Sequence, residues 1–380
     1  MRIFGPAIAV TAVSLLVAFL YGGPKALILC AILGVFEVTL SFDNAVVNAT
    51  VLRRMSEFWQ KIFITVGILI AVFGMRLVFP MLVVWITAGL NPARALQIAL
   101  NPPADGAMYF PDGSPSYETA LTAAHPQIAA FGGMFLMMLF LNFVFSEREI
   151  TWLGWLERPL GRAGKLDQLA AAVALIALVV AAEWSADEAN RTTVLIAGVL
   201  GVVSYIVVDG LGSMFDVDED ELMDAALAED AEGTPAGPAS GPSQLAVATG
   251  KAGFFLFLYL EVLDASFSFD GVIGAFAITS DPIIIALGLG FIGAMFVRSL
   301  TIFLVRKGTL SEYVYLEHGA YWAIGALALI LLVSIGTHVN EVFTGLIGLV
   351  LIAAAFLSSI VRNRRIAAAE AGDRVPTLTN

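Results

Sequence analysis

Runs of about 20 apolar residues recur along nearly the whole chain, and each is long enough to cross the ~30 Å hydrocarbon layer of a bilayer as a helix. The 380 residues are 59% hydrophobic and only 14% charged, which exceeds what a soluble domain needs to fill its core. The sequence therefore predicts an all-α integral membrane protein. Soluble enzymes and nucleic-acid-binding proteins are excluded.

Polar residues divide the apolar runs into ten candidate spans, which predict a polytopic transmembrane helical bundle of about 10 helices. The predicted spans are 4–22, 27–52, 61–89, 126–146, 167–183, 192–214, 252–278, 282–305, 319–336 and 341–361. Lys and Arg prefer the cytoplasmic side of a membrane. With the N-terminus inside, the inner segments hold 15 of them and the outer segments 3. We therefore expect a multi-pass protein of the inner (plasma) membrane with both termini cytoplasmic.

An acidic linker separates two membrane halves. Nine acids and no base lie between Asp216 and Glu232, and a Pro- and Gly-rich stretch follows up to Ser243. Such a composition buries too little apolar surface to order itself. The predicted organisation is a first membrane half at 1–214, a disordered cytoplasmic linker at 215–250, a second membrane half at 251–362 and a cytoplasmic tail at 363–380.

The two halves carry a related motif. Glu37–Val46 and Asp264–Ile273 each begin with an acid that is followed six residues later by Asp, and the two copies are offset by 227 positions. In each half the next apolar run contains an arginine, Arg76 or Arg298. Each half has five predicted spans, an odd number, so the two copies cross the membrane in opposite directions. This predicts an inverted repeat with a site at its interface near mid-membrane.

Five acids fall within the predicted motif spans: Glu37, Asp43, Glu261, Asp264 and Asp270. An isolated acid at a helix centre costs about 2.5 to 3.5 kcal/mol on insertion scales, so these side chains are expected to face one another, a cavity or a cation. A step of six residues leaves the second motif acid some 120° from the first on an ideal helix. Convergence on one site would require the helices to unwind near Ser-Phe-Asp, which Gly271 permits in the second copy. We therefore expect broken helices.

Carboxylates, hydroxyls and an Asn amide form an oxygen environment suited to Mn²⁺, Mg²⁺ or Ca²⁺. Soft metals are disfavoured, because Cys30 has no second thiol and the three histidines lie at predicted helix ends. Arg76 and Arg298 are candidates for counter-charge or for coupling. The competing interpretation is a structural network in which the two arginines neutralise the acids.

At this point the motifs resemble those of a known family. Glu37–Val46 and Glu261–Val272 look like the paired acidic motifs of the TerC-like integral membrane proteins, within the lysine-exporter superfamily. Such proteins are associated with tellurite resistance and, for several members, with manganese efflux. The resemblance implies six metal-site positions: Glu37, Asp43, Asn44, Glu261, Asp264 and Asp270. This chain departs from the pattern in having Gly271 where the first copy has Asn44, and in having more spans than the seven or so usual in the family.

Three functions compete at this stage. The first is a secondary transporter that exports a divalent cation, Mn²⁺ above others, by alternating access with proton exchange. The second is an intramembrane aspartyl hydrolase on Asp43 and Asp270, which the additional neighbouring acids disfavour. The third is a non-transporting scaffold or assembly factor. We expect no enzyme activity and no cofactor besides the transported cation. The expected partners are the metal ion, protons and the lipid bilayer, with no nucleic acid.

Overall fold

The structure is a computed structural model, and it describes residues 3–40, 42–67, 70, 74, 78, 92–101, 103, 107–166, 168–213, 250–276, 278–279, 281–306, 312–337, 339 and 341–373. Arg76, the predicted linker up to residue 249 and the tail beyond residue 373 lie outside the described residues. Asp43 and Asp270 belong to described helices, but their side chains lie outside the described part.

Apart from one β-bridge between Tyr109 and Pro115, the regular structure of the described residues is helical, which confirms the predicted all-α bundle. In chain order the elements are α1 Gly5–Leu40, α2 Phe42–Leu52, α3 Glu57–Ile62, η1 Phe63–Gly67, α5 Pro92–Leu100, α6 Tyr117–Phe145, α7 Gly154–Ala163, α8 Leu169–Ser185, α9 Arg191–Ser213, α11 Gly250–Phe276, α12 Pro282–Ile285, η4 Ala286–Gly293, α13 Ala294–Arg306, α15 Leu316–Ser334 and α16 Glu341–Asp373. The elements η1 and η4 are π-helical.

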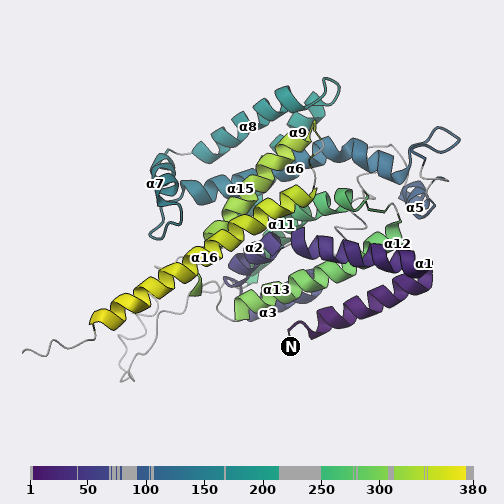
Figure 1. The fold of residues 1–380 in the computed structure, drawn as a ribbon. Coiled ribbons are helices and arrows are strands. Elements are labelled where there is room, and N and C mark those ends of the chain that lie inside the picture. The colour runs from purple at the N-terminus through teal and green to yellow at the C-terminus, as the bar shows by residue number, and fades with distance from the viewer. Residues whose placement is uncertain are drawn as a thin grey trace, which may run out of the picture.

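The first predicted span, 4–22, corresponds to the first arm of α1, and the second, 27–52, covers the second arm of α1 together with α2. The helix is interrupted at Gly22 and Gly23, and Gly23 has a φ of +67°, a conformation that glycine adopts without steric cost. Pro24 follows at the start of the second arm, where its missing N–H group is no loss. Figure 1 shows the two arms as a hairpin that turns at this point.

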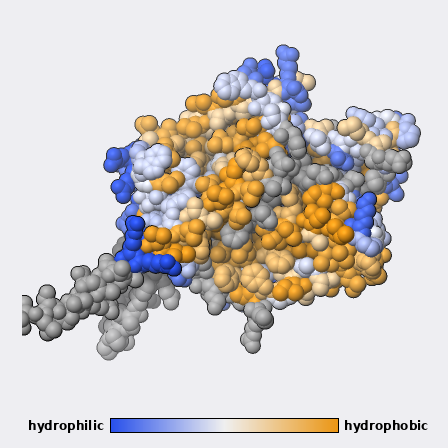
Figure 2. Space-filling model, in the orientation of Figure 1, coloured by the Kyte–Doolittle hydropathy of each residue, from blue (hydrophilic) through white to orange (hydrophobic). Residues whose placement is uncertain are grey.

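Within the described part of the chain, six helical segments are long and apolar enough to cross a membrane: Gly5–Val38, Tyr117–Phe145, Arg191–Gly210, Ile283–Val305, Leu316–Ser334 and Phe343–Ile366. The 17-residue α8 is a shorter apolar helix. Hydrophobic residues cover much of the face seen in Figure 2. These features identify a membrane-type helical protein. Most of the predicted span 61–89 lies outside the described residues, so the number of spans and the inverted repeat stay predictions.

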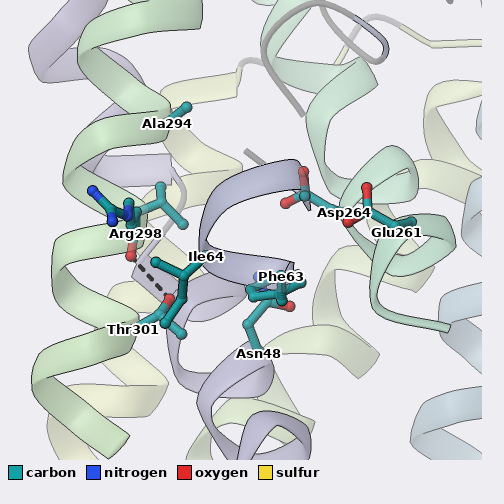
Figure 3. A pocket seen from close by; sticks show the side chains of 10 residues that line it. Asn48, Phe63, Ile64, Glu261, Asp264, Ala294, Arg298 and Thr301 are labelled. Atoms are coloured by element: carbon teal, nitrogen blue, oxygen red, sulfur yellow. Dashed lines mark hydrogen bonds between the residues drawn. The ribbon is translucent and has the colours of Figure 1, made fainter. Parts of the chain in front are cut away.

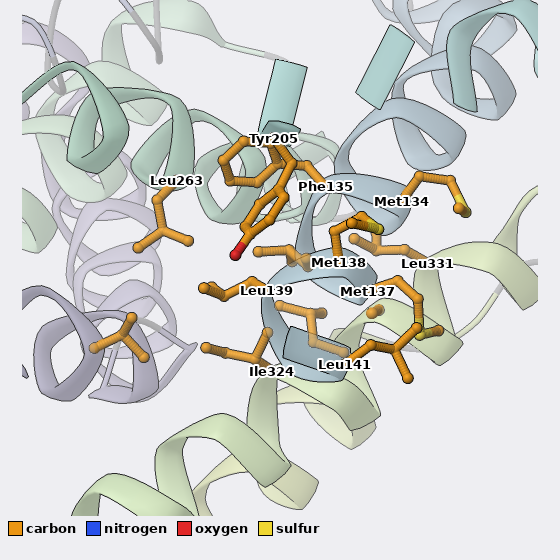
Figure 4. Close-up of a cluster of buried hydrophobic side chains, with 14 of the residues drawn as sticks. Met134, Phe135, Met137, Met138, Leu139, Leu141, Tyr205, Leu263, Ile324 and Leu331 are labelled. Atoms are coloured by element: carbon orange, nitrogen blue, oxygen red, sulfur yellow. The ribbon is translucent and has the colours of Figure 1, made fainter. Parts of the chain in front are cut away.

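The centre of the bundle is α6, whose apolar window is 72% buried, against 17% for that of α1. It packs against α8, α9, α11 and α15. Met134, Phe135 and Met138 of α6 meet Tyr205 of α9 and Leu331 of α15 in one cluster of buried side chains (Figure 4). The apolar face of α6 is therefore buried by protein, whereas that of α1 is left to face lipid.

A second buried cluster joins α1 to η4 and α12. Cys30 and Leu33 of α1 pack with Leu289 and Ile292 of η4. The helix α2 contacts both α11 and α13, and all three helices carry buried polar residues. In Figure 1, α7 and the C-terminal end of α16 lie at one end of the bundle and α5 at the opposite end.

Candidate cation site between the two halves

Glu261 and Asp264 lie on one face of α11, because residues three apart in a helix share a face. They are only 5% and 6% exposed. Both line a small cavity that is also lined by Asn48 of α2, Phe63, Ile64 and Gly67 of η1, and Ala294, Val297, Arg298 and Thr301 of α13. The cavity thus lies between elements of the first half (α2 and η1) and elements of the second half (α11 and α13).

Figure 3 shows Glu261 and Asp264 on one side of the cavity and Arg298 and Thr301 on the other. The volume open to a water molecule is about 30 Å³, which is roughly the room of one or two ordered waters. Its size suits a single ion that has lost most of its hydration shell.

A hydrogen bond joins the motif helices across the two halves. The Asn44 side-chain amide donates to an Asp264 carboxylate oxygen, with Nδ2 and Oδ1 2.6 Å apart. Both residues are more than nine-tenths buried. The Thr301 hydroxyl, which donates to Val297 O at 2.9 Å, lies 3.5 Å from Ala45 O. These contacts hold α2 against α11 and α13 at the cavity.

Glu261 has the most exceptional environment of the described acids. Neither of its carboxylate oxygens has a hydrogen-bond partner among the described residues, and the same is true of Asn48 Oδ1. Buried polar atoms in proteins are nearly always hydrogen-bonded, and a buried carboxylate without compensation is strongly destabilising. These three oxygens border one cavity, so a cation there would satisfy them together.

In each half, one buried acid lies directly against a glycine in the π-helix of the other half. A Cβ atom at Gly67 of η1 would lie 2.7 Å from Glu261 Oε1. In the converse contact, a Cβ atom at Gly293 of η4 would overlap Glu37 Cγ. Each of these acids therefore packs directly against the backbone of a π-helical segment from the other half.

The structure brings together only part of the predicted site. Asn44, Glu261, Asp264 and Arg298 meet at or beside the cavity, whereas Glu37, which is 2% exposed, is not among its lining residues. Arg76 and the side chains of Asp43 and Asp270 lie outside the described residues. Among the described side chains, no three of the types His, Cys, Asp and Glu are grouped for a metal ion. The described oxygen groups that line the cavity are therefore the carboxylates of Glu261 and Asp264, the Asn48 amide and the Thr301 hydroxyl.

The expectation of broken helices is wrong for the second copy. α11 continues as an α-helix through Ser268, Asp270 and Gly271 to Phe276. Helix continuation keeps the backbone hydrogen bonds made in an apolar environment that offers no water to replace them. In the first copy α1 is described as far as Leu40 and α2 from Phe42, and Ser41 between them lies outside the described residues, so the expected break stays a prediction there.

Sequence reasoning missed Asn48, Gly67 and Thr301 as site residues. Two had a readable signal, because Asn48 follows Asn44 by one helical turn and Thr301 follows Arg298 by three residues on the same face. Gly67 had none, since its importance comes from the approach of another helix.

A second buried polar cluster lies where α7 meets α15. Glu157 accepts hydrogen bonds from Trp322 Nε1 at 2.9 Å and from the Trp152 backbone at 2.9 Å, and it lies 3.2 Å from His318 Nδ1. Burial by itself raises the pKa of the Glu157 carboxyl, but the hydrogen bonds and the charge of His318 together outweigh it and lower that pKa below its usual value. The cluster fastens α7 to the bundle.

Comparison with known families gives one match. A family model described as "Protein of unknown function (DUF475)" matches residues 42–366. No curated protein and no solved structure matches the chain. The matched range includes α2, η1, α11 and α13, which are the elements that form the cavity.

Proposed function

Since this chain belongs to the DUF475 family, whose function is unknown, we propose from the chemistry of its own site that it is a secondary membrane transporter that exports a divalent metal cation. The observation that carries this proposal is Glu261. Its buried carboxylate lies beside Asp264 in a small cavity, and neither of its oxygens has a hydrogen-bond partner among the described residues. A bound cation is the simplest source of the missing interactions.

The donor chemistry supports a hard cation. The polar groups that line the described cavity besides Arg298 are carboxylate, amide and hydroxyl groups, and such oxygens suit Mn²⁺, Mg²⁺ and Ca²⁺. The buried Cys30 lies in the other cluster, with α1 and η4. The resemblance of the acidic motifs to those of TerC-like proteins, several of which are associated with manganese efflux, favours Mn²⁺ within this class.

The position of the cavity supports a carrier. Sites of secondary transporters lie between structural repeats, so that movement of one repeat against the other opens the site to either side. Here both halves line the cavity, with α2 and η1 from the first half and α11 and α13 from the second, and the acids Glu37 and Glu261 pack against π-helices of the opposite half. Protons are the proposed counter-ion, because they compete with metal ions for carboxylates.

The decisive experiment is metal flux in reconstituted vesicles with Glu261→Gln and Asp264→Asn. Both substitutions keep side-chain size and remove charge, so membrane abundance should stay near that of the wild type while Mn²⁺ flux is lost. Glu183→Gln is the matched control, because Glu183 lies at the end of α8 with a 61% exposed side chain and pairs with Arg191 at 3.5 Å. Normal flux in the two site variants would refute a transport site here.

The scaffold alternative makes a different prediction. If the protein acts by binding a partner through its acidic linker, truncation between Glu219 and Ser240 should abolish its effect on metal or tellurite resistance while the cavity acids are dispensable. A transporter should tolerate that truncation, since a solvated acidic segment does not form the membrane site.

A further inference from the structure

We propose that Gly67 determines which divalent cations the cavity accepts, because the backbone of η1 at this position forms the wall against which the Glu261 carboxylate lies. This inference rests on the proposed function, since it assigns the size limit of the same site. Gly67 contributes no side chain as a ligand. Its backbone limits the distance between the Glu261 carboxylate and the opposite side of the cavity.

The space around Gly67 is filled on three sides. A Cβ atom there would lie 2.7 Å from Glu261 Oε1, 3.2 Å from Phe63 Cδ2 and 3.5 Å from Phe257 Cε2. The first distance is shorter than any ordinary contact, so a methyl group would displace the carboxylate. The Phe63 ring at 3.2 Å is a tight neighbour and the Phe257 ring at 3.5 Å is in ordinary contact, so we expect the end of the flexible Glu261 side chain to move away from Gly67, within the cavity that both residues line.

The arrangement occurs a second time with the halves exchanged. Gly293 of η4 lies against Glu37, where an added Cβ atom would overlap Glu37 Cγ, as Gly67 of η1 lies against Glu261. Gly67 and Gly293 differ by 226 positions, within one residue of the 227-residue offset between the motif copies. The two acids are not counterparts, because the same offset pairs Glu37 with Asp264. What recurs is a π-helix glycine that lies against an acid of the other half.

The consequence for selectivity follows from ion size and hydration. Mg²⁺ requires short bonds of about 2.0 to 2.1 Å and gives up its waters reluctantly, whereas Ca²⁺ requires more ligands at about 2.3 to 2.6 Å. A cavity with room for about 30 Å³ of water-accessible volume disfavours a hydrated Mg²⁺. Its upper limit is set by the distance between Glu261 and the opposite wall. Moving the carboxylate inward should therefore exclude Ca²⁺ more strongly than Mn²⁺.

The test is competitive binding of Mn²⁺ and Ca²⁺ to the purified full-length protein, by titration calorimetry, for three variants. Gly67→Ala should lower the affinity for Ca²⁺ relative to Mn²⁺ by roughly tenfold, as expected when a ligand's support is altered. Glu261→Asp should shift the ratio the other way, because the shorter side chain withdraws from the cavity. The double variant Gly67→Ala/Glu261→Asp should return toward the wild-type ratio, since the methyl group occupies the space that the missing methylene leaves.

Gly74→Ala is the matched control, because among the described residues a Cβ atom at Gly74 would contact the side chain of Ile70 alone, at 3.3 Å. Its Ca²⁺ to Mn²⁺ ratio should equal that of the wild type. An unchanged ratio in Gly67→Ala, or a double variant shifted as far as either single one, would overturn the role of Gly67. If Gly67→Ala does not fold, an unshifted ratio in Glu261→Asp overturns it equally. Absence of divalent-cation binding in the wild type would instead overturn the proposed function itself.

Discussion

At the scale of single residues, burial and hydrogen bonding separate the acids of this chain into different roles. Glu157 is 6% exposed and surrounded by donors, whereas Glu261 is 5% exposed and has no hydrogen-bond partner among the described residues. The two acids are equally buried but differ in hydrogen bonding, which fits a structural role for Glu157 and the proposed ligand role for Glu261. Asp264 lies between these cases, because Asn44 already donates to one of its oxygens.

Removal of the Asn44 amide is expected to destabilise the protein. Asn44→Ala deletes the 2.6 Å hydrogen bond to Asp264, and a hydrogen bond to a charged group contributes about 1.5 to 3 kcal/mol. Thermal unfolding of the detergent-solubilised protein should show the loss, with Asn101→Ala as control because Asn101 bonds only locally, to Gln97 O. Equal melting temperatures for the two variants would contradict the importance of this bond.

The motif aspartates outside the described side chains give a second residue-scale prediction. Asp43→Asn and Asp270→Asn should each abolish metal export while membrane abundance stays near normal, because loss of a mid-membrane charge relieves an insertion cost and removes a ligand at once. Export into the medium and protein level in membranes are to be measured together. Loss of protein instead of loss of export would favour the structural-network interpretation.

At the scale of elements, α7 is held to α15 by polar contacts of Glu157. Glu157 of α7 binds Trp322 and lies beside His318 of α15. Next to this pair, Glu317 of α15 accepts from Arg53 at 3.0 Å and lies 3.7 Å from Arg148. The cluster thus joins the end of α2, the segment after α6 and the start of α15 at one end of the bundle.

The lowered pKa of Glu157 predicts how this attachment responds to acid. Its folded-state pKa lies below its usual value of 4.5, so its stabilisation is complete above pH 4.5 and is lost as pH falls through the folded-state pKa. Glu157→Gln should lower the melting temperature at neutral pH by roughly 3 °C, the effect of about one strong hydrogen bond in a protein of this size. The difference between wild type and variant should shrink below pH 4.5, and a difference that grows there would show the sign to be wrong.

At the scale of the whole molecule, the distribution of 15 Lys and Arg against 3 predicts the orientation. Cys30 is buried, so a Cys30→Ala background lets single cysteines report sidedness. In intact cells an impermeant thiol reagent should label Tyr109→Cys, at a residue that is 56% exposed, and should not label Ser240→Cys. The reverse pattern would invert the proposed topology.

Coupling is also a property of the whole molecule, because it requires both halves to expose one site alternately. Vesicles loaded with a pH-sensitive dye should acidify or alkalinise as Mn²⁺ moves, and an imposed pH gradient should change the Mn²⁺ flux. The Glu261→Gln variant should show neither response. Metal flux without proton movement would rule out exchange and leave a channel or a uniporter.

The sequence by itself determined the fold class and the polar content of the site. Apolar runs of bilayer length become helices because a helix satisfies its backbone without water, a local property that the sequence displays directly. The same reasoning located Glu261, Asp264 and Asn44, since buried polar residues in such runs are rare enough to single out. It also predicted breaks near Ser-Phe-Asp, which is wrong for α11, while in the first copy Ser41 lies outside the described residues.

Only the tertiary structure decided which residues of the neighbouring helices each buried acid contacts. Glu261 faces Asn48 and Gly67, and Glu37 faces Gly293, because of the rotation and depth at which separate helices pack. Residues 63–67 and 286–293 are π-helical, an irregularity that the apolar pattern of the sequence does not predict. Contacts between residues some 200 positions apart depend on the packing of the whole bundle, and a local pattern carries no information about them.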